Sequence, residues 1–453
     1  MKIIIAGAGA VGTHLAKLLS DEKQDIILMD ENEEKLSKLD SNFDLMTVNA
    51  SPTSISGLKN AGVAGADLFI GVMPEESRNM TACMLATNMG AKKTVARIDN
   101  YEYLLPKHKE FFSQLGVHSL IYPEMLAAKD IVDAIKMSWI RQWWEVCGGA
   151  LVLIGTKMRE KAEILDIPLH QLGGPELPYH VVAIKRNNET LIPRGDDVIK
   201  LHDIVYFTTT RKYIPYIRKI AGKEEYADVR NVMIMGGSRI AVRTTQYVPD
   251  YMQVKIIEND INRCNRLTEV VDDKVMIING DGTDRDLLAE EGLASAEGFA
   301  ALTNMDEENV MLSLYAKSMS KAKKITKINR NTFDTIIGSL GIGSLIYPKH
   351  ITSETILQYV RAMQNSIGSN VETLYRLVDG NAEALEFIIR GESEVTDIPL
   401  QELPIKKGIL VASINRKGEI IIPRGFDMLK KGDTVIVITQ LAGLNDIDDI
   451  LAK

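Results

Sequence analysis

Three glycines with nucleotide-binding spacing lie near the start of the chain. Gly7, Gly9 and Gly12 form the sequence GAGAVG, directly after an apolar run and directly before a helical pattern. In that context the first glycine makes a tight turn, the second lets the backbone approach a pyrophosphate, and the third lets helix and strand pack closely. Ala10 and Val11 open the helix, whose free N–H groups attract phosphate. The segment predicts a dinucleotide site, with a ligand-free glycine turn as the alternative.

An acidic residue suited to a ribose follows the glycine-rich segment. Asp30 ends the next apolar run, about 20 residues on, where a carboxylate binds ribose hydroxyls. Glu31, Glu33 and Glu34 follow, and no Arg or Lys lies directly beside Asp30 in the sequence. A 2′-phosphate would meet repulsion there, so the first site is predicted to take NAD(H) rather than NADP(H).

An altered copy of the same motif lies at 236–241, with the sequence GGSRIA. Gly236 and Ser238 fit the first two glycine positions, Ile240 lies in the helix that follows, and Glu258 takes the ribose position. Alanine replaces the third glycine, which the packing position accepts. The sequence therefore predicts a second nucleotide site.

Arg239 distinguishes the second motif from the first, which has Ala10 at this point. A guanidinium beside the phosphate cradle suits a phosphate chain, so ATP or ADP is expected here, with NAD(H) as the other candidate. The alternative is an ion pair between Arg239 and an acid such as Asp281 or Asp306.

Further polar residues follow the strands that should border the same crevice. Thr53 and Thr283 hold matching places after the third strand of each half, and Asp281 lies beside the latter in GDGTD. Arg97 ends the fifth strand, in TVARID, with Lys327 as its counterpart. A cation there would meet either a phosphate or a neighbouring acid. Because ligands of open α/β sheets bind at the carboxyl ends of strands, all these residues are candidates for nucleotide binding.

Catalytic groups are missing from these motifs. None of the seven histidines recurs in both halves of the chain, and no GKS/T, HExxH or GxSxG motif is present. A nucleotide site without a proton donor favours a sensor over an enzyme. The alternatives are an NAD-dependent oxidoreductase, which needs such a donor, and a ligand-gated transcription regulator, which needs a basic DNA-binding helix.

Composition narrows the classes further. The 453 residues carry a net charge of −8, which argues against a nucleic-acid partner. Three scattered cysteines predict neither a disulfide framework nor a cysteine zinc site, and favour a reducing cytoplasm. No apolar run approaches the roughly 20 residues of a membrane-spanning helix, so any membrane role is expected to go through a partner.

The whole chain is an internal duplication. AGVAGADLFIGV (61–72) matches EGLASAEGFAAL (291–302), and LIPRGDDVIKLHDIVYF (191–207) matches IIPRGFDMLKKGDTVIV (421–437). A period this long indicates tandem copies of a domain pair. The expected domains are 1–135 and 229–362, each a Rossmann-like N-domain, and 136–222 and 363–453, each a small C-domain.

Periodicity gives the fold class of each part. Strands at 3–6, 26–29 and 67–72 alternate with helices at 11–20 and 32–39, which predicts a doubly wound parallel sheet. Short strands at 150–154, 180–185 and 204–208, separated by Pro/Gly turns, predict a small β-rich α+β module. A helix near 124–146 is expected to carry Trp139 and Trp143 on one face, either buried against the rest of the lobe or at a dimer contact.

Taken together, these motifs resemble the regulatory subunits of Trk-type potassium uptake systems, which are built from RCK domains (regulators of potassium conductance). The resemblance rests on GAGAVG with Asp30, TVARID, LIYPEMLA, GGSRIA, GDGTD and the paired IPL and IPRG segments, and it covers nearly the whole chain. Two departures are Ala50-Ser51 and His202-Asp203, at places where the family has Gly-Asp.

The resemblance implies a function. Proteins of this family bind NAD(H), ATP or ADP in their N-domains and form oligomeric rings beneath a membrane-embedded Trk-type potassium channel subunit. It implies a homotetramer, with lobes pairing through helices near 124–146 and 349–365 and through the C-domains. It also implies a cytoplasmic protein, peripheral at the inner face of the plasma membrane, that shifts channel opening without covalent chemistry.

Overall fold

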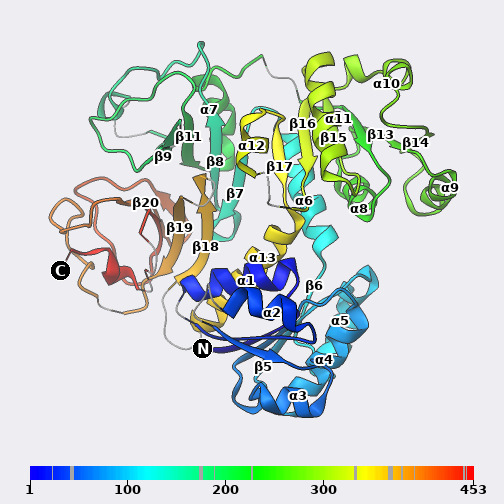
Figure 1. The fold of residues 1–453 in the computed structure, drawn as a ribbon. Coiled ribbons are helices and arrows are strands. Elements are labelled where there is room, and N and C mark those ends of the chain that lie inside the picture. Colours follow the sequence, from blue (N-terminus) through cyan, green and yellow to red (C-terminus); the bar gives the residue numbers. More distant parts are fainter. Residues whose placement is uncertain are drawn as a thin grey trace. The chain divides into compact units, whose positions relative to one another are not determined.

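The chain folds into two compact units, each assembled from both halves of the sequence (Figure 1). The computed structural model describes residues 1–22, 24–40, 45–172, 177–187, 189–225, 228–330, 334–365, 371–378, 381–391, 393–441, 444 and 446–452. One unit comprises Met1–Lys136 with Val229–Val360, and the other comprises Met137–Asp228 with Arg361–Lys453. We call the two parts of the first unit N-domains 1 and 2, and those of the second unit C-domains 1 and 2.

N-domain 1 is built on a six-stranded sheet in the order β3-β2-β1-β4-β5-β6. Its strands pair in parallel and are β1 (Lys2–Ala6), β2 (Asp25–Asp30), β3 (Met46–Asn49), β4 (Leu68–Gly71), β5 (Lys93–Arg97) and β6 (Ser119–Ile121). Its helices are α1 (Ala10–Asp21), α2 (Glu33–Asp40), α3 (Ile55–Asn60), α4 (Glu76–Asn88), α5 (Pro106–Gln114) and α6 (Pro123–Lys136). The order reverses between β1 and β4, which is where ligands bind in such sheets.

N-domain 2 repeats this sheet in the order β14-β13-β12-β15-β16-β17. Its strands are β12 (Asn231–Met235), β13 (Gln253–Glu258), β14 (Met276–Asn279), β15 (Gly298–Ala301), β16 (Lys323–Lys327) and β17 (Ser344–Ile346). Its helices are α8 (Arg239–Tyr247), α9 (Ile261–Val270), α10 (Arg285–Glu290), α11 (Asp306–Met319), α12 (Asp334–Ser339) and α13 (Pro348–Asn365).

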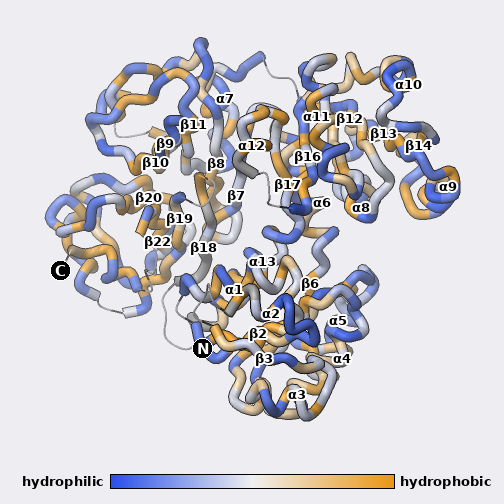
Figure 2. Tube along the Cα trace, in the orientation of Figure 1, coloured by the Kyte–Doolittle hydropathy of each residue, from blue (hydrophilic) through white to orange (hydrophobic). Residues whose placement is uncertain are grey.

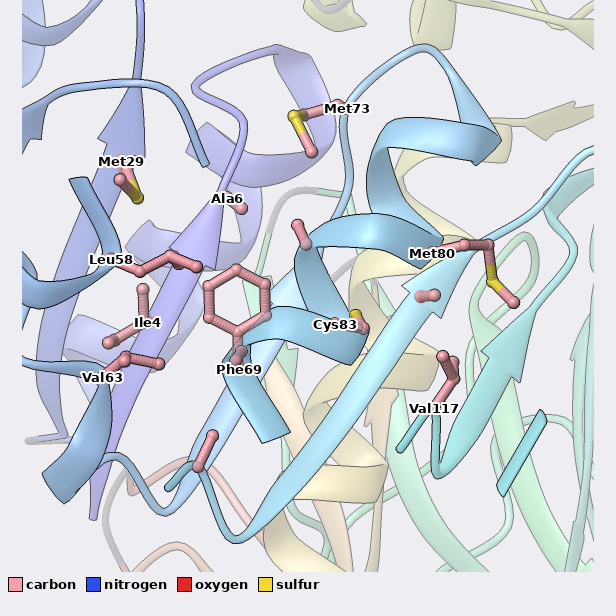
Figure 3. Close-up of a cluster of buried hydrophobic side chains, with 14 of the residues drawn as sticks. Ile4, Ala6, Met29, Leu58, Val63, Phe69, Met73, Met80, Cys83 and Val117 are labelled. Carbon is pink, nitrogen blue, oxygen red and sulfur yellow. The ribbon is translucent and has the colours of Figure 1, made fainter. Parts of the chain in front are cut away.

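Apolar side chains on both faces of the central strands form the cores of these sheets. In N-domain 1, Ile4 and Phe69 lie on neighbouring strands and pack against Leu58 of α3 and Cys83 of α4 (Figure 3). All four are fully buried. Figure 2 shows α2, by contrast, as mostly hydrophilic. A strand that is apolar on both faces belongs in a parallel sheet covered by helices, as the sequence predicts.

Two helices are exchanged between the N-domains. Ala127, Ile131, Val132 and Ile135 of α6 belong to the same buried cluster as Ile234 of β12, although α6 follows the last strand of N-domain 1. Figure 1 shows α6 beside β16 and α8 of N-domain 2.

The second exchanged helix, α13, reaches N-domain 1 in return. The Ser353 hydroxyl of α13 donates to the Val11 carbonyl of α1 at 3.2 Å. The His350 and His14 rings stack with their centroids 4.2 Å apart. Each N-domain is therefore completed by a helix from the other half of the chain.

The C-domains are two antiparallel sheets with equivalent strand orders, β10-β9-β11-β8-β7 and β18-β19-β22-β20-β21. The first holds β7 (Gln142–Val146), β8 (Leu151–Lys157), β9 (Tyr179–Arg186), β10 (Glu189–Leu191) and β11 (Ile204–Thr209), with α7 (Ile214–Ile220). The second holds β18 (Val371–Leu377), β19 (Ala382–Ile388), β20 (Ile409–Arg416), β21 (Glu419–Ile421) and β22 (Thr434–Thr439). One buried cluster joins Leu153 and Tyr206 of the first sheet to Ala384 and Ile436 of the second.

The predicted tryptophan-bearing helix is wrong. Helix α6 ends at Lys136, and Trp143 lies on strand β7. Trp139 lies between them, is 6% exposed, and packs in the core of C-domain 1. The β-branched and aromatic run after Lys136 favours a strand, and this preference outweighs the chance spacing of two tryptophans.

The predicted fold class is confirmed: a parallel Rossmann-like sheet followed by a small antiparallel β-rich domain, in tandem copies. The lobe contacts that we expected through the helices after the fifth strands and through the C-domains occur between the two halves of one chain. Among the described residues, no helix is long and apolar enough to cross a membrane.

Candidate functional site

The first glycine-rich turn has the geometry of a phosphate cradle. Gly7 has φ +114°, a conformation that favours glycine, and its N–H donates to the Met29 carbonyl at 2.8 Å. A Cβ at Gly12 would lie 1.9 Å from the Gly7 carbonyl oxygen, so helix and strand touch here as expected. A Cβ at Gly9 would meet no described atom within 4 Å, so this side of the turn is open.

Asp30 organises the loop beside this turn. Its Oδ2 accepts the Ala8 N–H at 2.7 Å, and its Oδ1 accepts the Asn32 N–H at 2.9 Å. The Lys35 ammonium lies 3.9 Å from Asp30 Oδ2. The expectation that no cation stands beside Asp30 is therefore wrong, because one turn of α2 brings Lys35 back to this point. The exclusion of a 2′-phosphate rests only on the surrounding carboxylates.

A pocket of about 550 Å³ opens next to Asp30. It lies at the carboxyl ends of β2, β3 and β4, the edge where a nucleotide would place its ribose and base. Its lining residues are Asp30, Glu31, Asn32, Glu33, Lys35, Pro52, Met73, Pro74, Glu75 and Arg78.

Arg78 is a pocket residue that sequence reasoning missed. Its guanidinium lies 2.7 Å from Glu31 Oε1. Hydrogen bonds from Ser51, with the larger effect, and from Arg78 hold the pKa of Glu31 below its ordinary value. Arg78 lies on α4, and the fold of that helix against the sheet brings it to Glu31, which follows β2.

The second glycine-rich turn repeats the acid contacts of the first. Gly236 has φ +90°, and the Gly237 N–H donates to Glu258 Oε2 at 2.8 Å. Glu258 Oε1 accepts the Asp260 N–H at 2.9 Å. Glu258 is 4% exposed, and Arg263 lies 3.5 Å from it. Matching backbone contacts in both halves place the ribose-binding acid candidates identically.

Arg239 forms ion pairs with acids from the other half of the chain. Its Nη2 lies 2.9 Å from Glu124 Oε1, and its Nη1 lies 3.7 Å from Asp99 Oδ1. The expected acid partners, Asp281 and Asp306, are not the ones used. Helix exchange explains this, because α6 carries Glu124 to the start of α8. Glu124 is 8% exposed, so the acid of this ion pair is buried, whereas the Arg239 side chain is exposed.

The helix starts place the other predicted residues of the turns. Ala10 is the first residue of α1, and the Val11 carbonyl accepts the Ser353 hydroxyl. The Ser238 side chain caps α8 by accepting the Ala241 N–H at 3.4 Å. Ile240 is 7% exposed and packs in the core, so only its backbone could meet a ligand.

The turns after the third strands differ in charge. Thr283 donates to Asp281 Oδ1 through its N–H and its hydroxyl, and these bonds lower the pKa of Asp281. In N-domain 1 the Ser51 and Thr53 hydroxyls lie 3.1 Å apart in the same place. Compared with Gly280-Asp281 of N-domain 2, Ala50-Ser51 of N-domain 1 keeps the turn and lacks its carboxylate.

Each fifth strand ends in a cation, and the two cations have different surroundings. Arg97 donates to the Met73 and Pro74 carbonyls and pairs with Asp99 at 3.0 Å, so the acid alternative is the one found. Lys327 is 3% exposed and contacts Asn304 at 3.3 Å. Burial lowers the pKa of Lys327 to about 8, against the opposing effects of Asp306 and Glu124.

Two buried asparagines hold these strand ends in register. Asn79 donates to the Met73 and Arg97 carbonyls at 2.9 Å, and Asn309 donates to those of Thr303 and Lys327. The two asparagines end the segments 73–79 (MPEESRN) and 303–309 (TNMDEEN), which match between the halves, and their role is structural.

The residues of the first turn and its pocket fit a nucleotide. Within the described ranges, no group of three or more His, Cys, Asp or Glu is placed to hold a metal ion. The open side of Gly9 leaves room for a pyrophosphate, and the free lone pairs of Asp30 suit ribose hydroxyls. The arrangement can bind and orient a nucleotide, and the groups that line it include no His or Cys.

Comparison with protein families gives matches in all but one of the four domains. The TrkA-N domain matches residues 3–123 and 232–348, and the TrkA-C domain matches residues 385–452. The chain is 31% identical to the Trk system potassium uptake protein TrkA of Halomonas elongata, over 96% of this chain and 95% of that protein. It is 30% identical to that of Haemophilus influenzae, over 96% and 95%.

Solved structures support the fold. A crystal structure of the GsuK RCK domain matches with a TM-score of 0.61 and 15% identity, over 96% of this chain and 92% of that chain. A structure described as the GsuK channel bound to NAD matches with the same TM-score and identity, over 97% of this chain and 76% of that one.

Proposed function

The chain belongs to the TrkA family, and we propose that it is a nucleotide-sensing regulatory subunit of a membrane-embedded potassium uptake channel. The observation that supports this most directly is the pair of matched turns. In each, an acid at the end of the second strand accepts the N–H that follows a glycine with positive φ. NAD bound to the GsuK channel is consistent with such a role.

In N-domain 1 we assign the ligand as NAD(H). The backbone from Gly7 to Gly12 would hold the pyrophosphate at the start of α1, and Asp30 would hold the ribose. The pocket lined by Arg78 and Met73 would take the remaining sugar and base. Thr53 follows β3 and Arg97 ends β5, at the same edge of the sheet, and both would border the site.

In N-domain 2 we assign ATP or ADP, with NAD(H) as the alternative. Gly236, Ser238 and the Ile240 backbone would form the cradle, Glu258 would bind ribose hydroxyls, and Asp281 and Thr283 would lie at the next turn. Arg239 would meet a terminal phosphate only by leaving Glu124, to which it is bound at 2.9 Å. Phosphate binding there would compete with an existing ion pair.

Regulation follows from linkage rather than chemistry. A ligand shifts a two-state equilibrium only by its differential affinity for the two states, and a coupling of ~1–3 kcal/mol changes channel opening roughly 5–150-fold. We infer that the chain acts at the cytoplasmic side, held there by the channel subunit, as a homotetramer in a closed ring.

Calorimetric titration of NADH, NAD and ATP into the purified full chain tests the proposal. NADH should bind at N-domain 1, and no turnover should follow when NADH is mixed with a panel of carbonyl compounds. Steady loss of NADH absorbance would replace the regulator with an oxidoreductase. Vesicle flotation should require the channel subunit, and light scattering that shows a monomer at micromolar concentration would exclude the tetramer.

A further inference from the structure

A histidine side chain links the two C-domains directly. The His180 ring, on β9 of C-domain 1, is hydrogen-bonded through Nδ1 to the Ala412 carbonyl on β20 of C-domain 2, at 3.1 Å. Because a carbonyl oxygen only accepts, Nδ1 carries the proton and donates it to this bond. Leu410 stands at the aligned position of the second half, so the duplicated fold itself does not require an imidazole here.

The strand registers place His180 on the face of its sheet that meets C-domain 2. His180 lies directly opposite Thr208 of β11, which lies opposite Leu153 of β8. Residues directly opposite one another on neighbouring strands share a face, and Leu153 belongs to the buried cluster that joins the C-domains. On the facing sheet, Ser413 lies opposite Ile436 of the same cluster.

The surroundings of His180 are apolar or neutral. Apart from one cysteine, the buried members of the joining cluster are aliphatic or aromatic. Thr208 is 1% exposed and Ser413 is fully buried, and neither hydroxyl has a hydrogen-bond partner among the described residues. A hydroxyl can orient toward a charge but cannot neutralise it, so this interface suits an uncharged ring.

The strand registers also locate the other titratable side chains on the joined faces. They are Cys147, Lys157, Lys185, Tyr206, Tyr375 and Glu386. Glu386 is the acid of this set, and it accepts the Cys147 N–H at 3.3 Å. Burial lowers the pKa of His180, the Ala412 hydrogen bond raises it by a smaller amount, and no charged group is among the causes. A protonated His180 would therefore lack a counter-ion where it now lies.

We propose that His180 makes the contact between the C-domains sensitive to acid, joining the two sheets as a neutral ring and loosening them once it is protonated. The proton comes from solvent and adds to Nε2, the ring nitrogen that the hydrogen bond to Ala412 leaves unprotonated. The charged ring must then stay in an apolar interface or move to water.

The direction of the pH dependence follows from the burial of His180. Its pKa in the closed contact lies below that of a solvated histidine, which is near 6.5. The contact therefore has its full stability above that pH and weakens as the pH falls below it. Acidification would thus act on the C-domains without a nucleotide.

Cys147 provides a reporter for the test, because it is 9% exposed and lies in the joining cluster. The full chain is treated with a dipyridyl disulfide, which reacts with thiols in acid, at about pH 7.5 and about pH 5.5, on either side of the solvated histidine value. Mass spectrometry identifies the modified cysteine. Labelling of Cys147 should become several-fold faster at the lower pH, and Cys83, in the core of N-domain 1, should stay unlabelled.

His180→Gln is the matched variant, because its amide can still donate to the Ala412 carbonyl but takes up no proton in this range. Its Cys147 should be labelled at the native rate at the higher pH, without acceleration in acid. His180→Leu, which copies Leu410, should also lack the acid response and serves if His180→Gln does not fold. His118→Gln removes a histidine of N-domain 1 whose pKa burial also lowers, and it should keep the native response.

Two results would overturn the proposal. One is an acid response of Cys147 that is absent from the native chain or equally large in the His180 variants. The other is labelling of Cys83 together with Cys147 at the lower pH, since acid would then unfold the chain rather than loosen this contact.

Discussion

The two halves of the chain share one backbone and differ in the charges around it. Both N-domains have the same strand order, the same glycine conformation at the turn, and the same acid contact to the following N–H. The first turn carries Ala10, and the second carries Arg239 bound to Glu124. The residue aligned with Glu124 in the other half is Lys349, whose ammonium donates to the Asn329 carbonyl at 2.8 Å.

The charge that faces each glycine-rich turn comes from the opposite half of the chain. Because α6 and α13 are exchanged, an anion, Glu124, faces the second turn, and the matching place opposite the first turn carries a cation. Duplication within one chain lets these charges change independently, which two identical subunits could not do. Divergent ligands at the two sites are the expected result.

Asp30→Ala should have the largest effect on this comparison. Loss of a charged hydrogen bond costs ~1.5–3 kcal/mol, so NADH affinity should fall roughly 10- to 150-fold in calorimetric titration. ATP binding at the second turn should stay unchanged. Asp30→Asn is the matched control, because it keeps one acceptor for the Ala8 N–H and separates folding from binding. Unchanged NADH affinity in both variants would remove N-domain 1 as the NAD site.

Lys327→Met should stabilise the protein, whereas its counterpart Arg97→Met should destabilise it. Burial holds the pKa of Lys327 near 8, below its ordinary value near 10.5, so the folded state is penalised while the amine is charged. That penalty is full below pH 8 and declines between pH 8 and 10.5. The variant should gain about 1–3 kcal/mol at pH 7 in denaturant unfolding and lose this pH dependence.

Arg97 has no such penalty to relieve, because it is held by two carbonyls and Asp99. Its replacement removes a donor from the Pro74 carbonyl and from Asp99, although the Met73 carbonyl keeps its hydrogen bond from Asn79. If Lys327→Met and Arg97→Met changed the free energy of unfolding in the same direction, the two cations would not differ in their effect on stability as we expect.

Glu124→Gln should increase the affinity of the second site for the phosphates of ATP. The variant weakens the ion pair that holds Arg239 and removes a negative charge beside the turn, so ATP affinity should rise roughly threefold to tenfold. Arg239→Ala should lower ATP affinity, and NADH binding at the first turn should be unaffected in both. If ATP affinity survives Arg239→Ala and NADH binding is also untouched, the sites have not diverged in the way proposed.

His202→Gly should give the smallest change, in the C-domains. His202 has φ +72° where the second half has Gly432 at φ +90°, so the first half holds a side chain in a conformation that favours glycine. Relief of that strain exceeds the added chain entropy, and unfolding should show a gain of up to about 1 kcal/mol. Gly432→His should show the opposite sign, and a loss in both would mean that the His202 side chain itself stabilises its turn.

The sequence predicted local structure and motif positions better than contacts between halves. The period of apolar residues located β1, α1 and β2 within one or two residues, because each is a strong, short-range pattern. Arg239 was singled out with an ion pair as one alternative, but its partner Glu124 lies more than a hundred residues away and is reached only through helix exchange. Lys35 and Arg78 were missed because only a helical turn brings them to Asp30 and Glu31.

The exchanged helices also bear on how the chain could be divided. Four α6 residues, each no more than 2% exposed, complete the core of the other N-domain, so neither half alone covers its own sheet. Separate expression of the halves should yield fragments that expose apolar sheet surface and aggregate. Co-expression of two polypeptides cut at the joint should restore the native assembly by fragment complementation. Fusion then keeps two unlike partners in strict one-to-one supply and prevents the mispaired assemblies that two identical first halves or two identical second halves would form.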